Sequence, residues 1–173
     1  LNHLEAALQK GVRVLMVVPG EPMAAIIHEK TKADAIDAAK RQGQTVSETR
    51  YSRVFAALAA LGAYEHFTLA ALVDGAKSGE YREIYTHAKV CVVDGLWATC
   101  GSANFVDLSM AADHTEMNAA IWDADVANNM LEALLRLHMD DPPAHNTASD
   151  VDWVEAACVE ARANAQRRRD GLA

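Results

Sequence analysis

Apolar residues change from helical to strand spacing near the start of the chain. Leu4 and Leu8 share one face of a predicted helix that follows an Asn-x-x-Glu capping pattern and stops at Gly11. The apolar, β-branched run Val12–Val18 comes next, and a Pro-Gly pair ends it. Such a run predicts a buried strand, and a helix followed by a buried strand is typical of an α/β fold.

The next stretch leaves two alternatives open. Residues 21–46 are rich in Ala and Lys, and their apolar spacing is not clean, so they form either a helix or a partly ordered insertion near a site. From Ser47 onward the pattern sharpens and predicts a helix that is capped at Gly62. The residues with helical spacing in it are Tyr51, Val54, Phe55, Leu58 and Leu61.

Several short strands are expected in the middle of the chain. They are His66–Val73, Arg82–Tyr85, Ala88–Val93, Leu96–Cys100 and Glu116–Trp122. Asp94 and Gly95 join two of these strands, and an Asp-Gly pair between apolar runs is a strong hairpin signal. A loop is predicted from Ser102 to His114.

Two helices are predicted after the last strand. One covers Asp123–His138 with Asp123 as a possible N-cap, and a pair of prolines separates it from a final helix over Val151–Arg168. The apolar face of the first helix is expected to hold Val126, Met130, Leu134 and Leu137. The whole pattern predicts an α/β domain over residues 1–140. Residues 141–173 are expected to be a loop and a helix packed on that domain or trailing it.

Composition and charge narrow the class of protein. The chain of 173 residues is long enough for one compact domain with a core. It is 51% hydrophobic, yet no apolar run reaches the roughly 18 residues of a spanning helix. These features predict a soluble domain, cytoplasmic or in peripheral contact with a membrane. The net charge of −8 counts modestly against a nucleic-acid partner, and the basic cluster Arg167–Arg169 is expected to be a solvated helix end.

Three cysteines occur, at Cys91, Cys100 and Cys158. Their spacings match no zinc pattern, and their number is odd. Since Cys91 and Cys100 lie in apolar runs, free and buried thiols are expected, as in a reducing compartment.

The residues that suggest chemistry begin at His87. His87 and Lys89 are two apart on a predicted strand, so their side chains are expected to share one face. An imidazole beside an ammonium group suits the binding of an anion next to a nucleophile or proton donor. Ser102 and Asn104, at the end of the neighbouring strand, could bind phosphate oxygens. Glu116 could accept a hydrogen bond from a histidine ring and fix its tautomer.

These residues are more informative as an ordered set than one by one. Asp94 alone indicates a turn, and is expected to support a site rather than to react. The ordered set of His-x-Lys, Asp-Gly, Gly-Ser-x-Asn and Glu resembles the phospholipase D superfamily, whose hallmark is His-x-Lys-x4-Asp followed by Gly-Ser-x-Asn. The matching residues are His87, Lys89, Asp94, Gly101, Ser102, Asn104 and Glu116. Leu108 stands where the family commonly has an arginine, so one basic contact is missing or supplied differently.

The resemblance is strongest to bacterial phospholipases D and cardiolipin synthases. It implies that residues 1–140 form an α/β half-domain, a C-terminal catalytic half with a mixed β-sheet flanked by helices. It implies a metal-free displacement at phosphorus that needs no cofactor, in which one histidine forms a phosphohistidine and a second protonates the leaving alcohol. Water or another alcohol then takes the phosphoryl group. Lysines and asparagines stabilise the transition-state charge, which assigns Lys89 and Asn104 to phosphate binding. Whether His87 attacks or donates the proton stays open.

That scheme needs two His-x-Lys motifs, and this chain supplies one. His28 and Lys30 repeat the letters, but no strand, aspartate or Gly-Ser-x-Asn follows them. The second motif is therefore expected from a homodimer mate or from an absent N-terminal half, and the start at Leu1 favours the absent half. The expected substrate is a phospholipid or another phosphodiester. A small dimeric nuclease and a non-catalytic module that needs a partner are the alternatives.

Overall fold

The computed structural model describes residues 2–20, 24–74, 82–104, 107–110, 114–140, 142–143 and 152–171. Within these ranges, residues 24–29, 51, 107 and 108 are described by their backbone alone. The side chains of His28 and Leu108 therefore lie outside the described part. The chain forms two compact units, Leu1–Tyr85 and Thr86–Ala173, which are treated one at a time.

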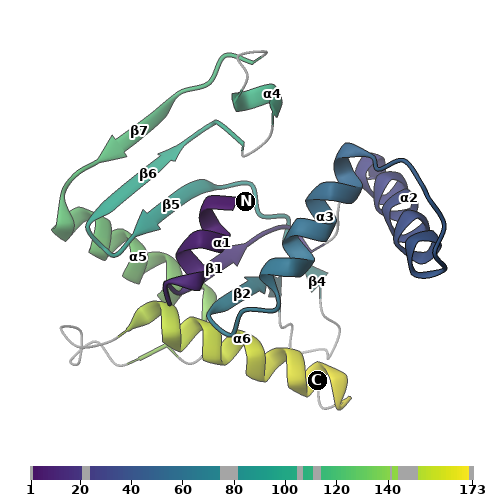
Figure 1. Cartoon of the computed structure of the whole chain (residues 1–173). Helices are drawn as coiled ribbons and strands as arrows, with labels where there is room; N and C mark the ends of the chain where they lie inside the picture. The colour runs from purple at the N-terminus through teal and green to yellow at the C-terminus, as the bar shows by residue number, and fades with distance from the viewer. Residues whose placement is uncertain are drawn as a thin grey trace. The chain divides into compact units, whose positions relative to one another are not determined.

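The first unit is built around a parallel pair of strands. Its elements are α1 (Asn2–Gln9), β1 (Val14–Val17), α2 (Ala24–Arg41), α3 (Arg50–Leu61), β2 (Phe67–Ala70), β3 (Val73–Asp74) and β4 (Arg82–Glu83). β1 pairs with β2 in parallel, and β3 with β4 in antiparallel fashion. Because parallel strands need a long crossover, α2 and α3 fill the connection between β1 and β2 (Figure 1).

Local signals explain where these elements begin and end. Gly11 adopts a φ of 82°, and the N–H of Val12 reaches back 3.1 Å to the carbonyl of Ala7, which closes the end of α1. Thr49 caps α3 by accepting a 3.0 Å bond from the Ser52 N–H. Gly62 caps the other end of α3, as predicted, with an ordinary right-handed φ of −64°.

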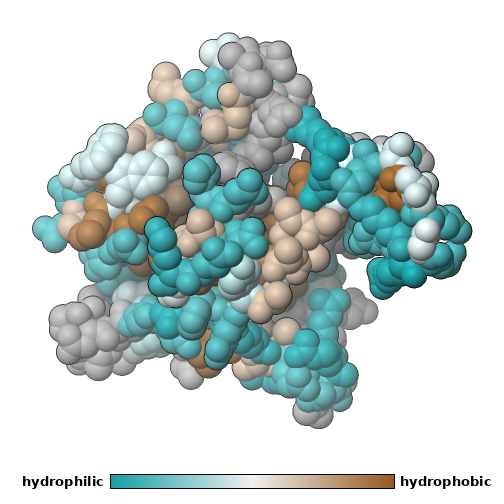
Figure 2. Space-filling model, viewed as in Figure 1, coloured by the Kyte–Doolittle hydropathy of each residue, from teal (hydrophilic) through white to brown (hydrophobic). Residues whose placement is uncertain are grey.

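Bulky apolar side chains form a buried cluster in the interior of the first unit. Leu8, Leu61 and Phe67 are buried together, and Leu58 and Tyr64 pack against them. The open question about residues 21–46 resolves as a helix over Ala24–Arg41, which packs against α3. Figure 2 shows a largely hydrophilic surface in this region, at the right of the view.

The second unit is an antiparallel sheet with helices stacked on one side. Its elements are β5 (Lys89–Val93), β6 (Trp97–Gly101), α4 (Asp107–Met110), β7 (Asn118–Ile121), α5 (Ala124–His138) and α6 (Trp153–Arg169). The strand order is β5-β6-β7. α5 packs against β5 and β6, and α6 packs against α5 (Figure 1). The α/β fold class is therefore confirmed, with its strands in small parallel and antiparallel sheets rather than in one sheet.

The predicted hairpin is confirmed between β5 and β6. Asp94 and Gly95 have φ angles of 54° and 65°, and the Leu96 N–H donates to the Val93 carbonyl at 3.0 Å. Two positive φ angles suit the right-handed twist of the flanking strands, which explains the Asp-Gly pair. Asn128 of α5 lies against the turn, and a Cβ added at Gly95 would be 3.1 Å from its Oδ1.

The apolar face predicted for α5 is right for Met130 and Leu134, which are half-buried, and wrong for Val126 and Leu137. Asp123 caps the helix as expected, accepting a 3.0 Å bond from Val126 N. However, Val126 and Leu137 are 47% and 76% exposed, while Ala127 and Leu135 are buried. The reason is close packing, because Ala127 and Ala98 of β6 are both fully buried, and two small side chains let the helix lie close to the sheet.

α6 is held to α5 by an aromatic and polar contact. Trp153 is 3% exposed, and the Arg136 guanidinium carbon lies 4.5 Å from the centre of its ring. Glu132 pairs with Arg136 at 2.8 Å, and Glu160 accepts a 2.8 Å bond from the Asp140 N–H. Across the residues placed by the structure, no helix combines the length and apolar character needed to cross a bilayer.

The three cysteines are free, as predicted, but they are not all buried. Cys158 is buried and Cys100 is half-buried, whereas Cys91 is exposed. Cys91 is paired with Thr99, next to Ala98, so it lies on the face of the sheet that is opposite α5. An apolar run therefore predicted the strand correctly and the burial of this thiol wrongly.

Candidate active site

Several of the predicted site residues lie at one end of the three-stranded sheet. Lys89 pairs with Gly101 across β5 and β6, and Gly101 pairs with Asn118 across β6 and β7. A Cβ added at Gly101 would lie 2.1 Å from Asn118 Oδ1 and 2.2 Å from the Met117 carbonyl oxygen. Glycine is therefore required in the middle of this row because the neighbouring strand leaves no room for a side chain.

His87 lies at the entrance to β5 and not within it. The strand begins at Lys89, so the two residues are not a same-face pair on one strand as expected. Lys89 instead donates through Nζ to the backbone carbonyl of His87 at 2.8 Å. His87 is exposed and Lys89 is half-buried. An ammonium group carries three N–H donors, so Lys89 keeps capacity to bind an anion beside the imidazole.

Ser102 is heavily engaged within the protein. Its hydroxyl donates to Glu116 Oε2 at 2.6 Å and accepts from the Met117 N–H at 3.0 Å. Its own backbone N–H donates to the Met117 carbonyl at 3.0 Å. The neighbouring Ala103 N–H donates to Asn118 Oδ1 at 3.1 Å. These bonds fix the turn after β6, and they leave Ser102 no spare hydrogen for a phosphate unless a bond is exchanged.

Glu116, just before β7, is at the centre of a group of polar side chains that we call the polar cluster. Its other members are Ser102, Ser109, His114 and Asn118. The carboxylate of Glu116 accepts 2.6 Å bonds from the hydroxyls of Ser102 and Ser109, and its Oε1 lies 3.8 Å from His114 Nδ1. The serine hydroxyl of Ser102 and then that of Ser109 hold the pKa of Glu116 below its ordinary value, with smaller contributions from the charges of His114 and Lys89. The lowered pKa favours the ionised form of this carboxylate, which only accepts hydrogen bonds.

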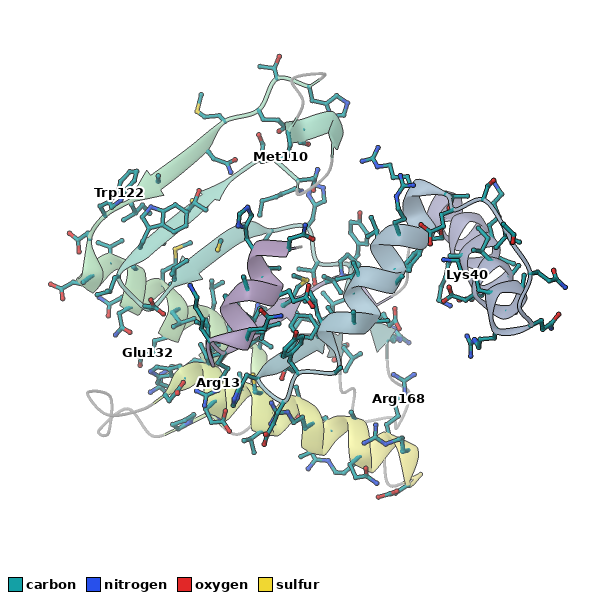
Figure 3. All side chains as sticks on the ribbon, in the orientation of Figure 1. Arg13, Lys40, Met110, Trp122, Glu132 and Arg168 are labelled. Carbon is teal, nitrogen blue, oxygen red and sulfur yellow. The ribbon has the colours of Figure 1, made fainter. Side chains whose placement is uncertain are left out.

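The remaining predicted residues are placed differently. Asn104 is exposed in the turn that follows β6. Asp94 lies in the turn at the other end of β5, which at about 3.3 Å per residue is roughly 16 Å from Lys89. The supporting role suggested for Asp94 stays a prediction. At that far end, Trp122 lies beyond β7 and meets Trp97 edge to face at 6.3 Å (Figure 3).

Sequence reasoning missed two residues of this cluster. Ser109 lies on α4, inside a stretch expected to be a loop, and donates to Glu116 from a position only 8% exposed. Asn118 joins the site through strand register alone. Asn118 carries no local signal, whereas Ser109 ends a run, 104–109, that resembles the Asn-x-x-Asp-Arg-Ser pattern common in the family. In the ranges that the structure covers, no group of His, Cys, Asp and Glu could hold a metal ion.

Comparison with known proteins gives the family of this fold and site. A comparison with curated proteins finds no match to this chain. The family described as "Cardiolipin synthase, PLD-like domain" matches residues 1–138, which include every residue of the polar cluster and leave α6 outside. The chain thus belongs to the phospholipase D superfamily, through a domain of the cardiolipin synthase type.

Proposed function

We propose that this chain supplies half of an active site for phosphodiester hydrolysis or phosphatidyl transfer on phospholipids. The observation that carries the proposal is the arrangement at the open end of the sheet. Lys89 binds the backbone carbonyl of His87, whose side chain is exposed. The carboxylate of Glu116 is held by Ser102 and Ser109, and its charge interacts with that of Lys89. Membership of a family named for cardiolipin synthase supports a phospholipid as the substrate class.

The reaction would proceed in two displacements at phosphorus. In the first, a ring nitrogen of one histidine forms a bond to phosphorus, and the bond to the alcohol oxygen breaks while a second histidine gives that oxygen a proton. In the second, water or another alcohol attacks phosphorus and gives its proton to the second histidine, and the phosphorus–nitrogen bond breaks. Lys89 and Asn104 would stabilise the charge on the phosphoryl oxygens. His87 fills one of the two histidine roles, either nucleophile or acid, and the scheme uses no metal or cofactor.

The second histidine would come from outside the cluster around His87. One source is a second copy of the chain, and the other is an N-terminal half of a longer polypeptide. Both sources would present a His-x-Lys motif to the phosphate from the opposite side. A small dimeric nuclease remains the second candidate function, against which the net charge of −8 counts, since phosphate neutralisation supplies most of the affinity for nucleic acid. A non-catalytic half that needs a partner remains the third.

One experiment tests the proposal and separates its forms. Solution mass is measured together with hydrolysis of phosphatidylcholine and of a small chromogenic phosphodiester, for the wild type, His87→Asn and His138→Asn. His138 is exposed in the last turn of α5, outside the cluster, and serves as the matched control. We expect His87→Asn to abolish turnover and His138→Asn to retain it.

The mass identifies the source of the second histidine. An active dimer that loses turnover with His87→Asn supports pairing between copies. An inert monomer that gains activity when mixed with a separate half carrying a His-x-Lys motif supports the fragment form. Unchanged turnover in His87→Asn would overturn the assignment of the site.

A further inference from the structure

Two serines bind the same carboxylate from very different surroundings. Ser102 is exposed in the turn after β6, beside the place proposed for phosphate. Ser109 is 8% exposed on α4, and both serines donate to Glu116 at 2.6 Å, one to each oxygen. Short O–H to carboxylate bonds are among the stronger hydrogen bonds in proteins. Glu116 therefore ties the turn after β6 to α4.

The chemistry of a hydroxyl limits what Ser102 can do. A serine has a single hydrogen to donate, so Ser102 binds either Glu116 or a phosphate oxygen, but not both. If Ser102 turned to a phosphate, Glu116 would keep, of its two serine bonds, the one from Ser109. At 8% exposure Ser109 meets little water, so its bond to Glu116 is less open to exchange than that of the exposed Ser102.

We propose that Ser109 is a positioning residue of this site, which holds Glu116 in place while Ser102 exchanges between that carboxylate and the substrate phosphate. The proposal rests on the proposed function for the identity of the phosphate. Ser109 would act through Glu116 and touch no reacting atom. Its loss would remove the hydroxyl bond from Glu116 Oε1, the oxygen that also lies 3.8 Å from His114 Nδ1, and would loosen α4 from the strand ends.

The test follows the titration of Glu116 by carbon-13 NMR, which needs no turnover. The variants are Ser109→Ala, Ser109→Thr and Ser102→Ala, with Ser52→Ala as the matched control. Ser52 is a 5% exposed serine whose hydroxyl donates to the Thr49 carbonyl in the first unit. We expect Ser109→Ala to raise the pKa of Glu116, Ser109→Thr to restore it, and Ser52→Ala to leave it unchanged.

Ser102→Ala keeps the proposal testable if Ser109→Ala fails to fold. In that variant the pKa of Glu116 should stay below its ordinary value, because Ser109 still donates to it. Inorganic phosphate should shift the Ser102 resonances of the wild type while Glu116 stays ionised. An ordinary Glu116 titration in Ser102→Ala, or an unchanged one in Ser109→Ala, overturns the proposal.

An activity measurement adds a readout that a structural role alone would not give. In the active assembly, Ser109→Ala should lower kcat roughly tenfold or more and change KM little, as expected for misplacement of a positioned group. An assembly that shows no turnover at all contradicts the proposed function, and the NMR result for Ser109 still stands by itself.

Discussion

The two units of this chain are stabilised in different ways. The first encloses bulky side chains, Leu8, Leu61 and Phe67, around its parallel strands. The second buries larger residues such as Trp153 and Leu135 on its helices, but the small residues Ala98 and Ala127 on β6 and α5, and polar bonds around Glu116 order one end of its sheet. Large apolar side chains remove much surface from water on folding. Small ones let a helix and a sheet approach closely, and buried hydrogen bonds favour one arrangement of the groups that they join.

This difference suggests that stability and catalysis depend on different units of the chain. All the candidate site residues from His87 to Glu116 belong to the second unit, Thr86–Ala173. Changes in the apolar cluster of the first unit should therefore appear mainly in the free energy of unfolding. Changes at the row of Lys89, Gly101 and Asn118 should appear mainly in activity. Each of the following predictions tests one side of that separation.

The largest effect is expected from Gly101→Ala. The added methyl group would meet Asn118 Oδ1 at 2.1 Å and the Met117 carbonyl at 2.2 Å, so β6 and β7 must separate there. A shift of about 1 Å in a positioned group costs roughly 100-fold in rate, and we expect at least that loss in kcat/KM. Gly43→Ala is the control, because its φ of 77° brings strain without any atom within 4 Å. If Gly101→Ala were as active as Gly43→Ala, the close packing of Gly101 against Asn118 would not be needed for activity.

The next effect concerns the other unit. Leu61 is 2% exposed in the apolar cluster, and truncating such a leucine to alanine costs about 2–5 kcal/mol of unfolding free energy. Urea unfolding of Leu61→Ala should show this loss, while the titration of Glu116 in the folded protein stays as in the wild type. Val54→Ala on the same helix is the control, since Val54 is 39% exposed and should cost much less. A changed Glu116 titration in folded Leu61→Ala would contradict the prediction that the apolar cluster affects stability and not the site.

The sequence predicted the features that depend on near neighbours. The hairpin at Asp94, the cap at Asp123 and the order of chemical residues from His87 onward all followed from adjacent letters, because turns and caps are decided within a few residues. The side of α5 that is buried depends on Ala98, a residue of another element. Only the folded sheet shows it.

The same limit explains what was missed at the site. Asn118 reaches the turn after β6 through strand register, and Ser109 reaches Glu116 from a short helix. Strand register and the position of a short helix are set by tertiary structure. A sequence motif therefore identifies its own residues but not the residues that bind to them in the fold. The motif named Ser102 as a phosphate ligand, while the structure shows that its hydrogen is already donated to Glu116.

The smallest effect contrasts one carboxylate from each unit. Glu48 in the first unit binds the ammonium group of Lys40, and this hydrogen bond and charge hold the pKa of Glu48 below its ordinary value. The pKa of Glu116 is lowered chiefly by neutral hydroxyls instead. Both groups stabilise the fold above their ordinary pKa of 4.5, and that stability is lost as the pH falls through the lowered values. Salt should separate the two groups.

At about 1 M salt the screening length falls to roughly 3 Å, which weakens attraction between exposed charges far more than a bond from a hydroxyl. Carbon-13 titrations at low and high salt should therefore move the pKa of Glu48 toward its ordinary value and leave that of Glu116 nearly in place. Lys40→Met supplies the reference for Glu48 without its ammonium partner. A Glu116 titration that moved with salt as much as that of Glu48 would mean that His114 and Lys89, rather than the two serines, keep this carboxylate charged.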